Sequence, residues 1–185
     1  MCIKHYYSPL FRIERAITMN HQDICNIITA ALPHGVLLNT QHTKFNSMVI
    51  GWGHAGVIWG LPSFVVYVRQ SRYTKPALDA SGVFTISAPL KGQRLSKDVF
   101  HICGSQSGRV VDKGKLFTLM PGRKIAVPAI KVYPVTLECR VLYEQDQALE
   151  RIPEEVRDRY YSQGTDVGDF HTAYIGQIVD AYVVE

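Results

Sequence analysis

The sequence lacks the long apolar segments that membrane proteins need. No run in its 185 residues approaches the ~20 consecutive apolar residues that span a bilayer. Residues 1–15 carry charges but have neither a sustained apolar stretch nor a small-residue cleavage site, so they do not indicate a signal peptide. We therefore expect a cytoplasmic protein that makes no use of a membrane.

Motifs for three common kinds of site are missing as well. No G-x-G-x-x-G follows a strand-like segment and no Walker loop occurs, which argues against a Rossmann site and a P-loop site. The four cysteines include no C-x-x-C pair, so we expect neither a disulfide framework nor a bound metal ion such as zinc.

Charge is sparse and only slightly positive. Asp, Glu, Lys and Arg make up 19% of the sequence, and the formal net charge is +4. The basic residues are spread along the chain instead of forming a dense stripe with interleaved aromatics, which argues against nucleic-acid binding. A modest positive field suits an anionic small molecule better.

The apolar pattern predicts one domain made mainly of strands. We expect a single domain, 1–185, with residues 1–20 as an N-terminal arm. About six strands are predicted, at residues 36–40, 46–53, 62–69, 83–87, 134–143 and 172–184. Short helices are predicted at 21–31, from 74 to the glycine at 82, at 93–102 and after 153. Strands with so few helices between them favour an antiparallel barrel or sandwich over a parallel sheet.

Residues 46–53 form a predicted strand with an unusual composition. Alternation places small and polar residues such as Ser47 on one face and larger ones such as Met48 and Trp52 on the other. Such a strand could lie against a flat aromatic ligand.

The segment Ser71–Lys75 is predicted to be an anion-binding turn that opens a helix. Thr74 is a suitable N-cap, and a helix N-terminus offers unsatisfied N–H groups and the positive end of the dipole. The hydroxyls of Ser71 and Thr74, the Arg72 guanidinium and an ammonium suit a phosphate monoester. The alternative is an ordinary capped helix with a solvated arginine.

Three further features could carry chemistry. The loop Ser105–Arg109 could close over a ligand, with Lys113 behind it as a second phosphate contact, or it could be a simple turn after a helix end. His171 could donate a proton or a hydrogen bond to a reduced cofactor or a substrate, or be structural. Cys103 could be a nucleophile, but a buried, inert thiol is favoured.

Five segments, in this order over residues 32–185, resemble a known family. They are 46–53 (NSMVIGWG), 67–74 (YVRQSRYT), 103–113 (CGSQSGRVVDK), 137–141 (LECRV) and 169–178 (DFHTAYIGQI). On these segments the chain resembles the flavin reductase-like, FMN-binding split-barrel proteins, and within them the flavoredoxin-type branch.

The resemblance implies a mainly β fold, a six-stranded antiparallel Greek-key split β-barrel with a few short helices. It also implies non-covalent binding of FMN near the interface of a homodimer. The isoalloxazine ring would lie along Asn46, Ser47 and Met48, with Trp52 close by. The phosphate would be held by Ser71, Arg72 and Thr74, helped by Lys113. His171 would stand near the flavin or the nicotinamide.

The implied activity is that of an oxidoreductase. NADH or NADPH would pass hydride to the flavin, which would pass electrons onward, for example to a downstream redox protein. Two other readings stay open at this point. One is a non-catalytic FMN-binding carrier without a nicotinamide site, and the other is a β-barrel interaction protein without a cofactor.

Overall fold

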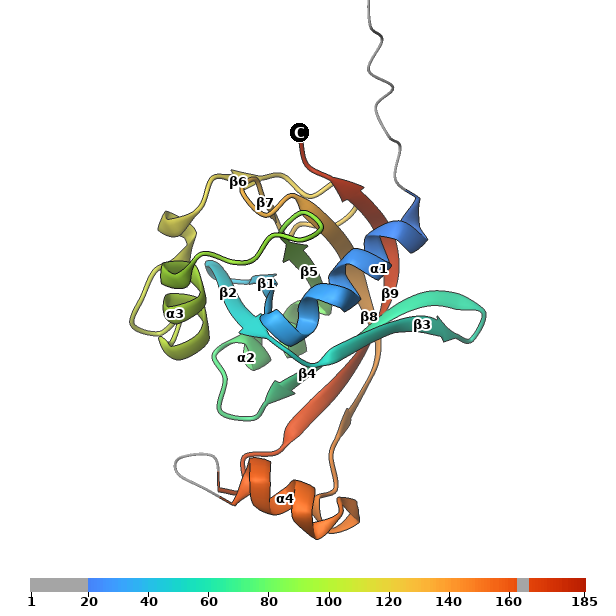
Figure 1. Cartoon of the computed structure of the whole chain (residues 1–185), viewed down its shortest axis with the longest axis vertical. Helices are drawn as coiled ribbons and strands as arrows, with labels where there is room; N and C mark the ends of the chain where they lie inside the picture. The colour runs from blue at the N-terminus through green and yellow to red at the C-terminus, as the bar shows by residue number, and fades with distance from the viewer. Residues whose placement is uncertain (1–19, 163–166) are drawn as a thin grey trace, which may run out of the picture.

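One antiparallel sheet organises the residues that this computed structural model describes, 20–162 and 167–185 (Figure 1). In this part of the chain the sheet has seven strands in the order β2-β1-β5-β8-β9-β4-β3. The strands are β1 (Val36–Gln41), β2 (Phe45–Ile50), β3 (Gly53–Ile58), β4 (Leu61–Arg69), β5 (Val83–Ala88), β8 (Val135–Asp146) and β9 (His171–Val183). Strands β6 (Leu119–Met120) and β7 (Ala129–Ile130) form a separate small pair.

Short helices connect and cover the strands. They are α1 (His21–Ala31), α2 (Thr74–Ser81), α3 (Lys97–Ser105) and α4 (Glu154–Tyr161), with 3-10 turns η1 (Leu32–His34), η2 (Lys113–Leu116) and η3 (Leu149–Arg151). None of the helices in the described ranges is long and apolar enough to cross a membrane. The predicted N-terminal arm, apart from Asn20, lies outside the described residues.

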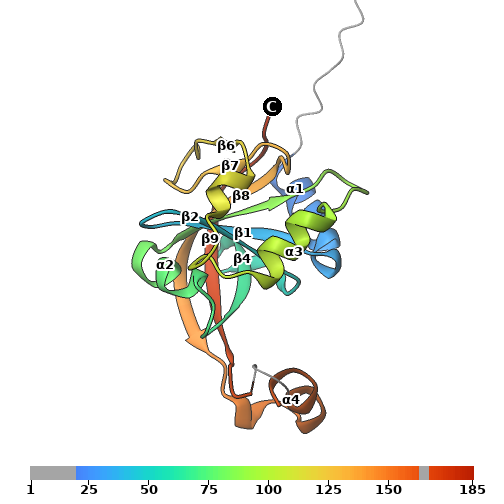
Figure 2. The same ribbon diagram turned by 90° about the vertical axis from the view of Figure 1, so that its left-hand side faces the viewer.

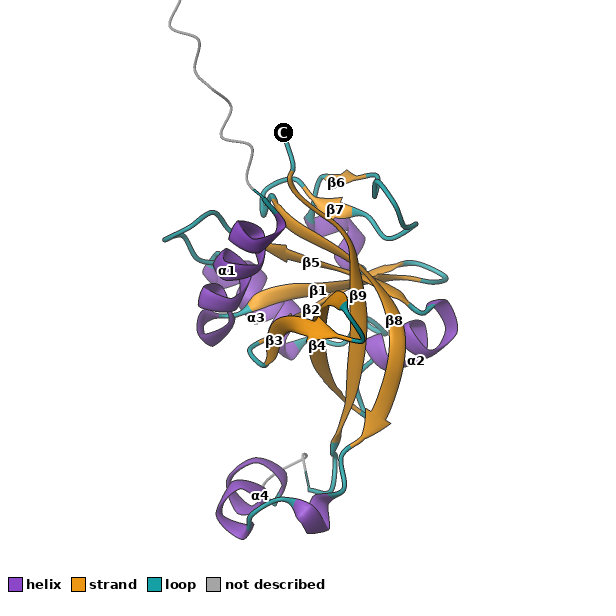
Figure 3. Cartoon of the chain, turned by 90° about the vertical axis from the view of Figure 1, so that its right-hand side faces the viewer, coloured by secondary structure: helices purple, strands orange, loops and turns teal. Residues whose placement is uncertain are grey.

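The connection between β2 and β3 determines the shape of the sheet. These strands lie at its two opposite edges, yet only Gly51 and Trp52 separate them in the chain. Three Cα–Cα steps span at most ~11 Å. The sheet therefore has to curl until its edges meet at Trp52, and Figure 3 shows this curvature.

The predicted mainly β, antiparallel class with a few short helices is confirmed, but the strand count differs. The strand predicted at 46–53 ends at Ile50, and residues 53–58, of which only Gly53 was predicted to lie in a strand, form β3 and pair with β4. A Cβ on Gly53 would lie only 2.7 Å from the Val65 carbonyl oxygen. Glycine at this position permits the close pairing, which local propensity did not indicate.

Alternation along β1 shows that both faces of the sheet are buried. Leu38 packs in the larger core, which also holds Phe64 and Phe84, whereas Leu37 belongs to a second cluster with Cys103. The larger core is completed by α1, which buries Ile24 and Ile28 one turn apart on one face of the helix. The second cluster lies under α3 and the segment 117–133. Because both faces are covered, a ligand has to approach this part of the sheet at an edge.

Glu138 fastens the loop that follows β6. Its carboxylate is fully buried and accepts hydrogen bonds from the backbone N–H groups of Arg123 (2.6 Å), Lys124 (2.7 Å) and Ile125 (3.0 Å). The hydroxyl of Tyr182 donates a fourth bond, of 2.7 Å, and burial together with this contact raises the pKa of Tyr182. One side chain thus satisfies four donors that would otherwise be buried without partners.

The long strands β8 and β9 run beyond their neighbours and carry α4 at their far end (Figure 2). Arg69 ties this extension to the body, since its guanidinium donates to the carbonyl oxygens of Tyr160 (3.0 Å) and Asp169 (2.8 Å). The extension therefore has a defined position relative to the end of β4, where Arg69 lies.

Candidate functional site

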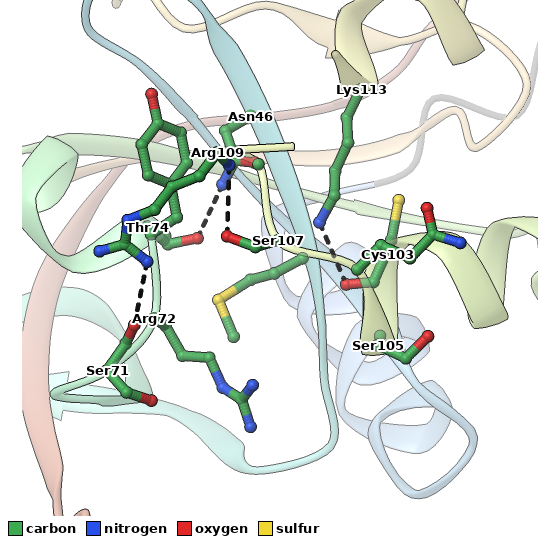
Figure 4. Close-up of a pocket in the computed structure, with 14 residues that line it drawn as sticks. Asn46, Ser71, Arg72, Thr74, Cys103, Ser105, Ser107, Arg109 and Lys113 are labelled. Atoms are coloured by element: carbon green, nitrogen blue, oxygen red, sulfur yellow. Dashed lines mark hydrogen bonds between the residues drawn. The ribbon is translucent and has the colours of Figure 1, made fainter. Parts of the chain in front are cut away.

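Two adjoining hollows open along the outer edge of β2. The first, which we call the Lys113 cavity, measures about 140 Å³ and is lined by β2, the Ser71 turn, the end of α3 and the loop after it (Figure 4). The second, the His171 hollow, measures about 170 Å³ and is lined by the end of β2, Tyr67, Arg69 and His171. Arg72 lines both, so the two hollows adjoin.

The predicted site residues converge on these hollows. Asn46, Met48, Ser71, Arg72, Thr74 and Lys113 line the Lys113 cavity. Trp52 and His171 line the His171 hollow. Ser47 lines neither, although its backbone carbonyl oxygen accepts a hydrogen bond from the Lys113 ammonium at 2.8 Å. The segments that the sequence analysis selected are therefore adjacent in space, although they are far apart in the chain.

The outer edge of β2 borders the site, in addition to the side chains of Asn46 and Met48. Because the Ser47 carbonyl accepts a bond from Lys113, it points away from β1. In an antiparallel ladder the N–H and C=O of one residue point to the same side and alternate residues repeat the direction. The N–H groups of Ser47 and Val49 therefore also point outward. The strand therefore offers backbone donors at its edge as well as the side chains that the sequence indicated.

Arg72 is the exposed cation at the junction of the two hollows. Figure 4 shows its side chain extending along the cavity, apart from the labelled side chains that bond one another. Among the residues that the structure describes, none forms a hydrogen bond or an ion pair with the Arg72 guanidinium. The group is therefore available to an anionic ligand.

The hydroxyls of the turn are used differently from the prediction. Thr74 is the first residue of α2 and not its N-cap, and its hydroxyl oxygen accepts a hydrogen bond from the Asn46 amide at 2.9 Å. Tyr73 occupies the N-cap position without a side-chain cap, which leaves helix N–H groups without a side-chain partner. The Ser71 hydroxyl and N–H both donate to the Asp169 carboxylate, at 2.6 and 3.0 Å.

Lys113 forms part of the cavity wall. Its side chain is buried, and its ammonium donates to the carbonyl oxygens of Ser47 (2.8 Å) and Cys103 (3.4 Å). Burial lowers the pKa of Lys113, the nearby Cys103 opposes this change, and the positive charge of Arg72 adds to it. An anion in the cavity would favour the charged form of Lys113.

The residues that line the two hollows carry positive charge. Arg72, Arg109 and Lys113 line the Lys113 cavity, and among the described residues that line either hollow there is no Asp or Glu. Clefts lined by one sign of charge attract ligands of the opposite sign. The arrangement therefore favours an anion in the Lys113 cavity.

His171 lies in an aromatic cluster at the seam of the barrel. Its ring centroid is 4.8 Å from that of Trp52, and its Nδ1 lies 2.9 Å from the Tyr161 hydroxyl. That hydroxyl donates to the Gln147 side-chain oxygen at 2.8 Å, and the Trp52 ring meets Tyr160 edge-on at 5.1 Å. These partners orient the imidazole at the mouth of the hollow.

The partners of His171 could not be found from local sequence patterns. Tyr160 and Tyr161 end a polar helix, and Gln147 follows β8, so no spacing relates them to Trp52. The only signal was the pair of aromatics at the end of an otherwise polar helix.

Cys103 lies under the Lys113 cavity as a free thiol that is 2% exposed. Burial raises the pKa of Cys103, while the nearby Lys113 lowers it by less. Since the thiolate is the nucleophilic form, this environment supports the expectation of an inert thiol.

Comparison with known proteins gives a consistent family assignment. The family model described as "Flavin reductase like domain" matches residues 29–185. An uncharacterized protein of Archaeoglobus fulgidus is 30% identical over 116 residues, which cover 62% of this chain and 52% of the relative. The chain thus spans about half the length of this curated relative.

Solved structures show the same fold. A flavoredoxin from Methanosarcina acetivorans matches with a TM-score of 0.61 and 28% identity, over 82% of this chain and 68% of that chain. An FMN-binding protein from Thermus thermophilus, solved with 1-cyclohex-2-enone, matches with a TM-score of 0.59 and 20% identity. The match covers 99% of this chain and 80% of that chain. A Streptomyces globisporus NADH:FAD oxidoreductase matches with a TM-score of 0.59 and 16% identity. The match covers 82% of this chain and 75% of that chain.

Proposed function

The chain belongs to the flavin reductase-like family, and from this premise we propose that it binds FMN in the two hollows and works as an NAD(P)H-dependent oxidoreductase. Its likeness to a flavoredoxin agrees with the branch indicated by the sequence motifs. The activity would be that of a flavin reductase or of an electron-transfer flavoprotein.

The observation that carries the proposal is the pairing of the two hollows at Arg72. The Lys113 cavity is cationic and contains the uncapped start of α2, which suits a phosphate. The His171 hollow is bordered by the Trp52 ring and by the outward N–H of Val49, which suits the edge of a planar, polar ring. A ligand with a phosphate at one end and such a ring at the other matches both.

Size and unsatisfied polar atoms are consistent with this ligand. Small-molecule pockets usually measure ~300–1,000 Å³, so neither hollow alone would hold a whole flavin nucleotide, but the adjoining pair can share one. The Asn46 side-chain oxygen is buried and has no hydrogen-bond partner among the described residues. A ribityl hydroxyl at this wall of the cavity would satisfy it.

Each part of the chain has a definite task in the proposed function. Arg72 and the first N–H groups of α2 would bind the phosphate. The buried ammonium of Lys113, in the cavity wall, would help to neutralise the phosphate charge. The outward N–H groups of Ser47 and Val49 would orient the ring and stabilise negative charge on it. When bound, FMN supplies the hydride-accepting and electron-donating chemistry.

The electron donor, the acceptor and the assembly are further parts of the proposal. We assign NADH or NADPH as donor, which is supported by membership of the flavin reductase-like family and by the similarity to the Streptomyces NADH:FAD oxidoreductase. The carrier without a nicotinamide site is the alternative. We also propose a homodimer, with a small molecule or a downstream redox protein receiving the electrons.

Flavin absorbance and rapid mixing test this proposal. The purified chain, as isolated or after incubation with FMN, should show the absorbance of bound flavin, and mixing with NADH or NADPH should bleach it within seconds. Failure to retain FMN would rule out both flavin functions. Retention of FMN without bleaching would leave only the carrier.

His171→Ala is expected to slow reduction of the flavin by the nicotinamide about tenfold, since one positioned hydrogen bond contributes roughly this factor. The dissociation constant for FMN should stay the same, because His171 lies at the far end from the phosphate cavity. Stopped-flow rates measure the first quantity and flavin titration the second. His42→Ala, at an exposed histidine of the β1–β2 hairpin, is the control. An unchanged rate of reduction in the His171 variant would refute the assigned role.

A further inference from the structure

The loop 105–109 forms one wall of the Lys113 cavity, next to the Ser71 turn. We propose that Arg109, Tyr73 and Gly108 form a seal there that makes the site selective for the mononucleotide FMN over the dinucleotide FAD. This inference rests on the proposed flavin-binding function and names the residues that decide which flavin is accepted.

Gly108 brings the loop into direct contact with the opposite wall. A Cβ at this position would lie 2.2 Å from the Asn46 side-chain oxygen and 2.4 Å from a ring carbon of Tyr73. Real side chains do not tolerate such distances, so only glycine allows the loop to sit this close. The cavity is therefore covered at the wall formed by β2 and the Ser71 turn.

Arg109 ties the same loop to the turn. Its guanidinium donates to the Ser71 carbonyl oxygen at 3.4 Å and lies over the Tyr73 ring, 5.4 Å from the ring centroid (Figure 4). Its backbone N–H donates to the Ser107 hydroxyl at 3.2 Å, which keeps the loop compact. The ammonium of Lys44, in the β1–β2 hairpin, lies 5.5 Å from the same Tyr73 ring. The Tyr73 ring is thus held from two separate segments.

The seal distinguishes the two flavins because they differ in what their phosphate carries. The phosphate of FMN is terminal, so it can end inside a cavity of about 140 Å³ that the loop 105–109 borders. In FAD the same phosphate carries an adenylate group, which has to leave the cavity. Its exit past the Ser71 turn would separate Arg109 from Tyr73 and Ser71.

The fold alone does not impose this selection. The Streptomyces globisporus protein with the same fold is an NADH:FAD oxidoreductase, so this fold can accommodate a dinucleotide. The difference has to come from local residues around the phosphate, and in this chain those residues are in contact with one another.

Dissociation constants for FMN and FAD, measured by fluorescence titration, test the seal. The wild-type chain should prefer FMN by about 100-fold. Arg109→Lys keeps the charge but loses the planar contact with Tyr73, and the preference should fall about tenfold. Arg109→Ala should lower it at least as far. Arg94→Ala, at an exposed arginine that does not line the cavity, should keep the wild-type preference.

The possible results separate the two proposals. Equal binding of FMN and FAD by the wild-type chain would overturn the seal and leave the proposed function in place. The same would follow if both Arg109 variants kept the wild-type ratio. Binding of neither flavin by the wild-type chain would overturn the proposed function itself, and the seal with it.

Discussion

Replacing Arg72 with alanine is expected to weaken FMN binding about 100-fold, because charge-assisted hydrogen bonds to a phosphate are among the strongest that one side chain forms. Arg72 is exposed and lines both hollows, and its guanidinium has no hydrogen-bond or ion-pair partner among the described residues. Its removal should therefore cost binding and almost no stability. Fluorescence titration with FMN and chemical unfolding measure the two effects.

Two controls identify the phosphate as the group that Arg72 binds. Riboflavin lacks the phosphate and should bind the wild-type and variant chains about equally. Lys75→Ala removes the same charge from the next turn, but the Lys75 ammonium is paired with Asp79 at 3.1 Å and does not line the cavity. It should therefore retain FMN. An Arg72 variant with undiminished FMN affinity would show that the phosphate is bound elsewhere.

Glu138→Gln should have the largest effect on stability, about 4 kcal/mol. The two carboxylate oxygens accept four hydrogen bonds, two each, in a fully buried position. An amide of the same shape would turn one of these oxygens into a donor that faces at least one backbone N–H group, whichever way it is oriented. Chemical unfolding followed by circular dichroism, at one fixed protein concentration, measures the loss.

Glu144→Gln is the matched control for this prediction. Glu144 lies on the same strand, but it is exposed, so its neutralisation should change the free energy of unfolding by less than ~0.5 kcal/mol. A loss below ~1 kcal/mol for Glu138→Gln would contradict the buried network, since two unsatisfied donors cost more than that.

Local patterns were sufficient for most elements of the fold. The helix predicted at 21–31 is α1, and the strands predicted at 36–40, 62–69 and 83–87 differ from β1, β4 and β5 by one residue at an end. Their apolar periodicity and flanking Gly or Pro are properties of a few adjacent residues. The exceptions arose from a distant pairing in one case and from a local helix cap in another. Strand β3 exists because β4 pairs with it, and α3 starts at Lys97 because Ser96 caps it.

The sequence predicted which segments form the site, but it did not predict the hydrogen bonds between their side chains. The 46–53 strand, the Ser71 turn and the loop up to Lys113 all meet at one cavity. The hydroxyls of Ser71 and Thr74, however, bond to Asp169 and Asn46, which the local sequence of the turn could not indicate. Arg72 stays available because no such partner reaches it in the described ranges.

The sequence by itself determined the strand-rich class, the family and the segments that form the site, because alternation, turn residues and motifs are local features. Only the tertiary structure decided that the site lies at the outer edge of β2 and that Trp52 meets His171 there. The physical reason is the closure of the sheet. Two edge strands joined by Gly51 and Trp52 must curl toward each other, and the side chains that this brings together are separated by most of the chain.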